Sequence, residues 1–389
     1  MPLTYCLNVH PGETWDENFA TVRTTVLAVR DLVSPGRAFG LGLRLGAEAA
    51  GTLLSTVRAA EFSAFLQSEN LHVLTVNAFP YGRFHGGPVK ENVYAPDWRS
   101  PKRVAFTNQV ASILANVIPA GGVASISTVP CSWKEWINSP SDIPLILENL
   151  TDAVAHCARV ATQHGRDILL ALEPEPGCLL ETTPETIKFF NEYLFTEGAT
   201  MLAARLRSSH ATATALIRHH LGVCLDTCHA ALQFEDPAEC LQLYEREGIR
   251  VPKIQISSAL STDNTPAALE ALRPFVEPVY LHQVKARLPG GEILSWTDLP
   301  EALEALRAIG PAEVRVHFHV PLHFTGDGPL RSTAPLLAPA FLTRIPHLPQ
   351  THLEIETYTW DVLPAALRST TIEQSIAAEF HWLRERGCS

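Results

Sequence analysis

The 389-residue chain lacks several features that would place it in familiar classes of protein. No apolar run approaches the roughly 20 residues that a membrane-spanning helix needs, so we expect no membrane insertion. Residues Met1–His10 are not a basic stretch followed by an apolar one, which predicts no secretory signal and a cytoplasmic protein. The formal net charge of −11 disfavours nucleic acid as a partner, because such partners require a basic surface.

Paired cysteines and nucleotide-binding loops are also missing. The eight cysteines are scattered, and only Cys224 and Cys228 lie close together, without a CxxC pair. In a chain of this length that pattern predicts buried thiols in a reducing compartment rather than a disulfide framework. Neither a GxGxxG after the first predicted strand nor a Walker loop is present, which disfavours the dinucleotide- and nucleotide-binding versions of an open sheet.

What is present is an alternation of short apolar runs with longer helical patterns. The apolar runs are typical of parallel strands that are covered on both faces. Repeated βα units with short connections predict an α/β fold with a parallel sheet, and we expect one (β/α)8 TIM barrel over residues 1–389. The strand candidates are Tyr5–His10, Ala38–Leu45, His72–Ala78, Ala124–Val129, Ile168–Glu173, Leu221–Asp226, Lys253–Ser257, Val314–Val320 and His352–Thr357.

Nine strand candidates for eight places in a barrel mean that one assignment is wrong or belongs to an insertion. The segment Tyr280–Trp296 has the pattern of a hairpin that turns at Pro289–Gly291. We therefore expect a hairpin insertion around 280–296, after the seventh strand. The segments Phe79–Ser100 and Pro321–Pro339 contain proline and glycine, which predicts long loops over the mouth of the barrel.

Polar side chains gather where the apolar runs end, and in TIM barrels that end carries the active site. Glu173 follows five apolar residues, and a buried carboxylate is costly unless it is paired, hydrogen-bonded or bound to a metal. Asp226 ends another apolar run, and His229 follows it three residues later. Oxygen and imidazole ligands together suit zinc, manganese, iron or cobalt. A structural role remains the alternative for each, such as an ion pair with arginine for Glu173.

Two further strands supply candidate ligands. Gln255 stands between two isoleucines in its strand, so its side chain points to the opposite face from theirs. Its amide either ligates a cation or hydrogen-bonds in the core. Glu356 and Glu354 share one face of the last strand, and the later residue is the one expected to reach the mouth. The predicted metal ligands are therefore Glu173, Asp226, Gln255 and Glu356, with Glu173 and Glu356 also as catalytic acid and base.

Histidine and lysine side chains are the candidates for contacting the substrate. His317 and His319 share a face of their strand, and either is a ligand, a substrate contact or a core histidine. His282 and Lys285 lie on the expected insertion, where they reach over the mouth or remain in solvent. The predicted substrate-binding residues are His10, His229, His282, Lys285 and His319.

Short motifs resemble the xylose isomerase-like TIM-barrel superfamily, which includes sugar isomerases, epimerases and endonuclease IV-type enzymes. The motifs are ALEPEP at Glu173, CLDTCHA at Asp226 and His229, KIQISSA at Gln255 and IET at Glu356. The resemblance implies a metal held by Glu, Asp, His and Glu, and this chain departs from it because glutamine stands in the third place. In such epimerases the histidine of the DxxH motif contacts substrate, and in the nuclease branch it binds metal.

Over most of its length the chain looks closest to the EboE family, through NVHPGETW, YLHQV, VHFHVP and ETYTW. Members of that family are encoded with genes for the export or processing of a bacterial secondary metabolite. The resemblance implies a cyclitol or a lipid-linked polyol as a plausible substrate, with pathway proteins as possible partners. It implies no particular reaction, because a fold by itself does not give a function.

Three functions follow from these residues. The first is isomerase or epimerase chemistry on a small polyol, sugar or cyclitol, with a divalent metal (Mn, Zn, Co, Fe or Mg) that polarises a carbonyl. The second is metal-assisted hydrolysis of a phosphate ester, with His229, His317 and His319 completing a site for two or three ions. The third is a carrier that binds a metabolite without catalysis. One bound ion per chain favours the first function, and two or three favour the second.

Overall fold

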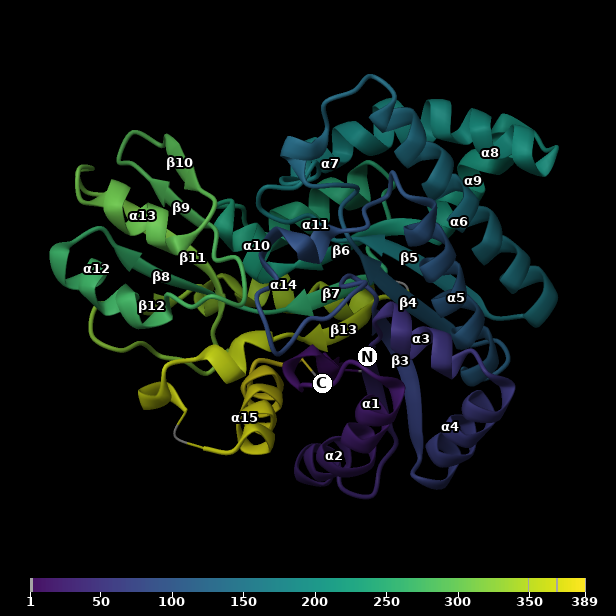
Figure 1. Ribbon diagram of the computed structural model, residues 1–389, viewed down its shortest axis with the longest axis horizontal. Helices are drawn as coiled ribbons and strands as arrows, with labels where there is room; N and C mark the ends of the chain where they lie inside the picture. The colour runs from purple at the N-terminus through teal and green to yellow at the C-terminus, as the bar shows by residue number, and fades with distance from the viewer. Residues whose placement is uncertain (1–2, 349, 369, 389) are drawn as a thin grey trace.

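The computed structural model describes residues 3–348, 350–368 and 370–388. Eight parallel strands form a barrel in the order β1-β13-β7-β6-β5-β4-β3-β2, and a bridge between Cys6 and Gly42 joins its two edge strands (Figure 1). This confirms the predicted TIM barrel. The strands are β1 (Leu3–Tyr5), β2 (Phe39–Arg44), β3 (Leu71–Asn77), β4 (Val123–Thr128), β5 (Asp167–Leu172), β6 (Leu221–Asp226), β7 (Lys253–Ile256) and β13 (His352–Ile355).

Helices cover the outside of the barrel and begin at well-formed caps. Thr182, for example, accepts a hydrogen bond from the backbone of Glu185, whose carboxylate accepts one from the backbone of Thr182, and Pro184 occupies the first turn. The helices are α1 (Trp15–Thr21), α2 (Leu27–Val33), α3 (Ala47–Leu53), α4 (Thr56–Ser68), α5 (Pro101–Val117), α6 (Asp142–His164), α7 (Thr183–Phe189), α8 (Ala199–Leu206), α9 (His210–His220), α10 (Thr227–Leu232), α11 (Pro237–Arg246), α12 (Pro266–Leu272), α13 (Leu299–Leu306), α14 (Pro339–Leu342) and α15 (Ile372–Glu385). No helix in the described part of the chain is long and apolar enough to cross a membrane.

A second sheet of five antiparallel strands lies between β7 and β13 in the sequence and beside the barrel in space (Figure 1). The predicted strand Val314–Val320 belongs to this sheet and not to the barrel, which accounts for the ninth strand candidate. The segment 321–339 also adds a short strand to the sheet, where we expected a loop over the mouth. The strands are β8 (Ala259–Asp263), β9 (Val284–Arg287), β10 (Ile293–Trp296), β11 (Glu313–His319) and β12 (Arg331–Ser332), in the order β10-β9-β11-β8-β12.

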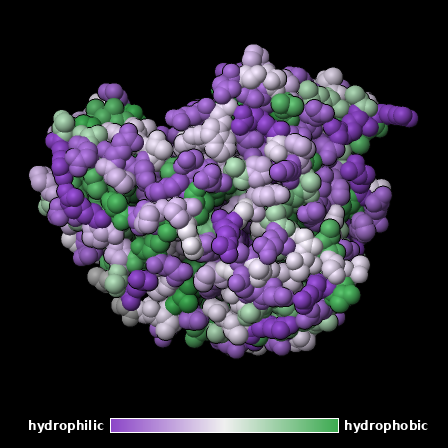
Figure 2. All heavy atoms as spheres, in the orientation of Figure 1, coloured by the Kyte–Doolittle hydropathy of each residue, from purple (hydrophilic) through white to green (hydrophobic). Residues whose placement is uncertain are grey.

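The antiparallel pair β9–β10 lies within the segment where we expected a hairpin, and it is one edge of this larger sheet. The sheet packs its inner face against α12 and α13 around a hydrophobic cluster that includes Phe275, Phe318 and Leu306. It meets the barrel through contacts between β11 and α10. Polar residues dominate the face seen in Figure 2, with apolar ones in small groups over the second sheet and along its junction with the barrel.

The interior of the barrel is unusually polar below its mouth. TIM barrels normally fill this space with branched apolar side chains. Here the Nζ atom of Lys253 lies 2.6 Å from Oε2 of Glu354, and both side chains are fully buried. A Cβ atom at Gly42 would lie 2.0 Å from Oε1 of Glu354, so the absence of a side chain at Gly42 makes room for this ion pair. The pair forms the layer beneath the residues at the strand ends.

Candidate functional site

Three carboxylates meet at the carboxyl ends of the barrel strands. Glu173 follows β5, Asp226 ends β6 and Glu356 follows β13. Ligand oxygens of the three lie within 4.8 Å of one another, and all three side chains are buried. Parallel pairing brings these strand ends together, because the carboxyl ends of all eight strands lie at one end of the barrel. The structure thus assembles three of the four predicted metal ligands into one cluster.

Burial and crowding make this cluster costly without a positive charge. Burial raises the pKa of Glu173 to about 8, and burial together with Glu173 and Asp226 raises the pKa of Glu356 well above its usual value. Burial also acts to raise the pKa of Asp226, but His229, His319 and hydrogen bonds outweigh it and lower that pKa. Carboxylates this close cannot all ionise readily unless a cation lies among them.

Asp226 is fixed by the turn that it begins. Its Oδ1 atom accepts hydrogen bonds from the backbone amides of Cys228 and His229 and from the Ser257 hydroxyl, so it caps α10 and ties that helix to the next strand. Among the described residues, its Oδ2 atom has no hydrogen-bond partner. Asp226 therefore has one oxygen in a structural role and the other free for a ligand.

Two asparagines orient Glu356. Its Oε1 atom accepts hydrogen bonds from Nδ2 of Asn8 at 2.7 Å and from Nδ2 of Asn77 at 3.2 Å. Asn8 follows β1 and Asn77 ends β3, so both also come from strand ends. The sequence shows polar residues at strand ends. It does not show that these two asparagines contact Glu356, because each lies hundreds of residues from it in the chain.

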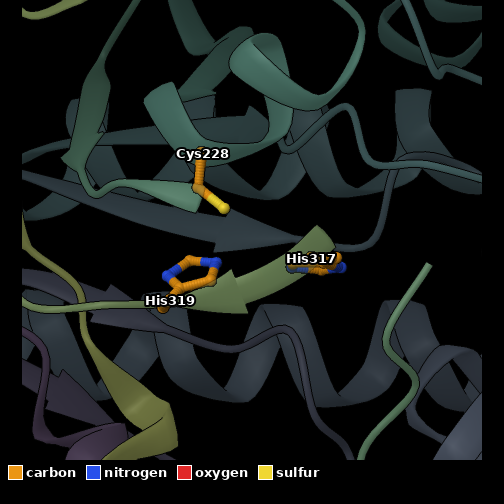
Figure 3. A group of neighbouring side chains, drawn as sticks. All are labelled: Cys228, His317 and His319. Atoms are coloured by element: carbon orange, nitrogen blue, oxygen red, sulfur yellow. The ribbon is translucent and has the colours of Figure 1, made fainter. Parts of the chain in front are cut away.

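Three histidines lie beside the carboxylates. Nε2 of His229 is 3.1 Å from Nε2 of His317, and Nδ1 of His229 donates to the backbone oxygen of Pro174. His317 and His319 project from β11, and Figure 3 shows Cys228 pointing from the barrel side toward the His319 ring. Ligand atoms of Cys228, His317 and His319 lie within 4.8 Å of one another. Burial raises the pKa of the Cys228 thiol well above its usual value, so it is a neutral neighbour of the rings.

Gln255, the fourth predicted metal ligand, is also fully buried at the strand ends. Its Oε1 atom is 2.6 Å from Sγ of Cys224, which donates to it. Its Nε2 atom, a donor, has no partner within the described part of the chain. The oxygen that would ligate a metal is therefore engaged with the Cys224 thiol. Glu354, which shares a strand face with Glu356, lies deeper and pairs with Lys253.

A cavity of about 60 Å³ opens above the cluster. Glu173, Glu356 and His229 reach it from the barrel, and residues of the 79–94 segment, which was expected to cover the mouth, form much of its wall. Five of the lining residues are phenylalanine or tyrosine, which suits the apolar faces of a small ligand. The lining residues are Asn8, Asn77, Phe79, Pro80, Phe84, Val89, Lys90, Val93, Tyr94, Glu173, Glu175, His229, Tyr280, Leu281, His317, Glu356 and Tyr358.

The other predicted substrate-binding residues do not line this cavity. His10 lies 3.0 Å from the Tyr5 hydroxyl, through its Nε2 atom. Lys285 pairs with Glu181 at 2.6 Å, and His282 contacts Glu277 and the backbone oxygen of His317. His319 is completely buried and does not line the cavity. His229 is thus the one member of that predicted group that lines the cavity.

Glu175 and Tyr94 are cavity residues that the sequence did not mark as functional. The Tyr94 hydroxyl donates to Oε1 of Glu175 at 2.9 Å, and burial raises the pKa of Glu175 to about 7. Glu175 stands three residues after the end of β5, and no local pattern distinguishes it as a functional residue. Tyr94 comes from a short helical turn in the 79–100 segment, where no local pattern distinguishes it.

Known proteins resemble this chain in structure rather than in sequence. No family model matches the sequence, and no curated protein matches it. Solved structures resemble it at low identity. The match to a xylose isomerase domain protein from Planctomyces limnophilus covers 93% of this chain and 91% of that protein's chain, with 16% identity and a TM-score of 0.49. The match to a xylose isomerase domain protein from Alicyclobacillus acidocaldarius covers 99% of this chain and 97% of that protein's chain, with 12% identity and a TM-score of 0.48. The match to an L-ribulose 3-epimerase covers 99% of this chain and 96% of that protein's chain, with 11% identity and a TM-score of 0.46.

These structural neighbours are xylose isomerase-like TIM-barrel proteins, and one is described as a sugar epimerase. Likenesses at these identities and scores do not indicate what this chain acts on. The narrower resemblance to the EboE family rests on the sequence segments alone.

Proposed function

We propose that the chain is a metal-dependent isomerase or epimerase of a small sugar, polyol or cyclitol. The observation that carries this proposal is the cluster of Glu173, Asp226 and Glu356, whose ligand oxygens lie within 4.8 Å of one another at the floor of the cavity. Carboxylates at three strand ends fit a divalent cation, and the oxygen and nitrogen donors nearby suit Mn, Zn, Co, Fe or Mg.

The unpartnered atoms support a cation at this place. Oε2 of Glu173 and Oδ2 of Asp226 are buried and have no hydrogen-bond partner in residues 3–348, 350–368 and 370–388. Both atoms can only accept when the carboxylates are ionised, and isolated buried charges are strongly unfavourable. A divalent ion held by Glu173, Asp226 and Glu356 satisfies them, and when bound it polarises a substrate carbonyl.

Glu173 and Glu356 are the residues proposed to move protons. Both line the cavity. Glu173 follows β5 and Glu356 follows β13, and β6 and β7 lie between these two strands in the barrel. One removes a proton from the carbon next to a carbonyl, and the other returns it, which exchanges the configuration or the carbonyl position. Asn8 and Asn77 orient Glu356 for this role.

The finer assignment follows from the EboE-like segments. We propose that the substrate is a cyclitol or polyol intermediate of a bacterial secondary-metabolite pathway, and that the enzyme works beside other proteins of that pathway. The carboxylates and asparagines that line the cavity offer hydrogen-bond acceptors and donors to the hydroxyl groups of such a molecule.

Proton exchange tests the reaction even while the product is unidentified. The metal-loaded protein is incubated in deuterated water with a panel of ketoses, aldoses and oxidised cyclitols, and deuterium incorporation is followed by mass spectrometry. Glu173→Gln and Glu356→Gln should each lower the exchange rate by about 10²–10⁴-fold. Glu301→Gln, at an exposed position on α13, is the control and should leave the rate unchanged. Full activity of both active-site variants would exclude the proposed mechanism.

Hydrolysis of a phosphate ester is a second candidate, and the paired histidines favour it. Nε2 atoms of His229 and His317 face each other at 3.1 Å, and ligand atoms of these residues and Glu175 lie within 4.8 Å of one another. This group and the carboxylate cluster together have enough donors for more than one ion. Elemental analysis separates the candidates, because one ion per chain supports the isomerase and two or three support the hydrolase.

A further inference from the structure

The carboxylate cluster comes entirely from the barrel and has no nitrogen ligand from β7, where Gln255 stands. We propose that His319, which belongs to the inserted sheet, is the nitrogen ligand of the metal, so that the insertion completes the metal centre. This inference rests on the metal of the proposed function and assigns one of its ligands to a different part of the fold. Three observations on His319 and one on Gln255 support it.

The first observation fixes the tautomer of His319. Its Nδ1 atom lies 2.9 Å from the backbone oxygen of Glu356. A backbone carbonyl can only accept, so the proton is on Nδ1 and Nε2 carries a lone pair. Metal-binding histidines commonly donate their second ring nitrogen to a carbonyl in this way, which holds the ring in place. Here the carbonyl belongs to a residue of the carboxylate cluster itself.

The second observation is that the free nitrogen has nothing to bind. The His319 side chain is fully buried, and its Nε2 atom has no hydrogen-bond partner in the part of the chain that the structure describes. A ligand atom of His319 lies within 4.8 Å of ligand atoms of Asp226 and His229. Oδ2 of Asp226 is unpartnered as well. Buried acceptors that gather without donors are satisfied by a cation.

The third observation concerns the strand that carries the histidine. The pairing of β11 with β8 shifts between Val316 and His319, so the regular ladder is interrupted just before the ring. Such irregularities bend a strand and redirect its side chains, and they are frequent beside active sites. The Thr359 hydroxyl, from the segment after β13, donates to the backbone oxygen of His319 and ties the end of β11 to the barrel.

The orientation of Gln255 and the extent of the cavity disfavour the simplest alternatives. The carbonyl oxygen of Gln255 already accepts from Cys224, which leaves its NH₂ group on the free side. An amide NH₂ does not ligate a cation. His319 does not line the cavity, so a role in contacting substrate does not fit its position. A ligand below the floor of the cavity fits both facts.

Metal binding by matched variants tests the inference. Purified full-length protein is stripped with a chelator and titrated with Co²⁺, with binding followed by calorimetry and by the visible absorption of the ion. His319→Ala should weaken binding by at least about tenfold and change the spectrum, because a nitrogen ligand is lost. His352→Ala is the control, since His352 is also a buried histidine, but it begins β13, at the other end of that strand from Glu356, and its Nδ1 atom lies 3.0 Å from the Ser125 hydroxyl. Its Co²⁺ affinity should stay close to that of the wild type, as should that of Gln255→Leu.

A measurement on the wild-type protein covers the case in which His319→Ala does not fold. Hydrogen exchange of the β11 amides should slow when Co²⁺ is added, because the ion links the inserted sheet to the barrel. Unchanged exchange in β11, or equal Co²⁺ affinity and spectrum for His319→Ala and wild type, overturns the inference and leaves the proposed function standing. A wild-type protein that binds no divalent ion overturns the proposed function itself.

Discussion

The barrel and the inserted sheet differ in how their strands are buried and in what they contribute to the site. Strand β6 of the barrel is buried at every residue, whereas β10 of the inserted sheet alternates exposed and half-buried positions. The barrel presents carboxylates at its strand ends, and the inserted sheet presents imidazoles from β11. Neither region holds the whole candidate site, which lies where the two meet.

The difference shows how an insertion changes the chemistry of a barrel. The barrel interior already contains a buried ion pair and three crowded acids, so it has an excess of acceptors. The inserted sheet has its own hydrophobic cluster, which allows it to present His317 and His319 from a rigid strand. Rigid strands position ligands better than loops do.

The largest effect is expected in the core of the inserted sheet. Phe318 is fully buried, and its ring packs edge-on against Phe275 with centroids 5.0 Å apart. Phe318→Ala should cost about 3–5 kcal/mol of stability in this region. Hydrogen exchange should show faster opening of β8, β9 and β11 and near-normal protection of β3 to β5. Equal loss of protection in both groups would mean that the chain unfolds as one cooperative unit.

A comparable effect is expected from the ion pair inside the barrel. Lys253→Met leaves Glu354 buried without its partner and should lower the free energy of unfolding by about 3–5 kcal/mol, as measured with denaturant. The double variant Lys253→Met/Glu354→Leu removes both charges and should recover most of that loss. If the double variant were as unstable as the single one, the pair would matter through packing rather than charge.

A smaller, pH-dependent effect is expected at the joint between the regions. Oε1 of Glu379 on α15 accepts hydrogen bonds from the Leu322 amide, just beyond β11, and from the Thr357 hydroxyl, just beyond β13. Burial raises the pKa of Glu379 to about 7 from an ordinary 4.5. The folded state therefore binds the proton more tightly than the unfolded state does. The resulting stabilisation is fully present below about pH 4.5 and is lost as the pH rises through 7.

Glu379→Gln removes this titration. The stability of the wild type relative to Glu379→Gln should fall by about 3 kcal/mol between pH 4.5 and pH 7. Denaturant unfolding of both proteins over this pH range measures the difference between their free energies of unfolding. The contributions of the other buried acids cancel in that difference, because both proteins contain them. A difference that does not vary with pH would show that Glu379 keeps the same charge in the folded and unfolded states.

The smallest effect is expected from substituting two glycines, one in a crowded place and one in an open place. Gly42→Ala places a methyl group against Glu354 and should cost about 1–3 kcal/mol through overpacking in the barrel. Gly51→Ala, in α3, meets nothing within 4 Å and should stabilise the protein by about 0.5–1 kcal/mol. Thermal unfolding of the two variants checks the signs. A neutral Gly42→Ala would show that the ion pair can move away from the new methyl group.

The sequence predicted the barrel well because its strands are continuous apolar runs that end in polar residues. Seven of these runs, from Ala38–Leu45 to His352–Thr357, correspond to β2–β7 and β13. The run Val314–Val320 has the same pattern but pairs antiparallel with β8 and β9, which no local pattern reveals. The extent of the second sheet was missed for a related reason, since β10 and β12 are short and largely exposed or half-buried.

By itself, the sequence determined that this chain folds as a parallel barrel and that Glu173, Asp226 and Glu356 stand at strand ends. Both are local facts, because hydrophobic periodicity and the end of an apolar run are visible along the chain. Only the tertiary structure decided which side chains meet these acids. His319, Asn8 and Asn77 come from distant segments, and Gln255 turns its oxygen toward Cys224. Contacts between segments far apart in the chain depend on packing and register, which single-sequence patterns do not encode.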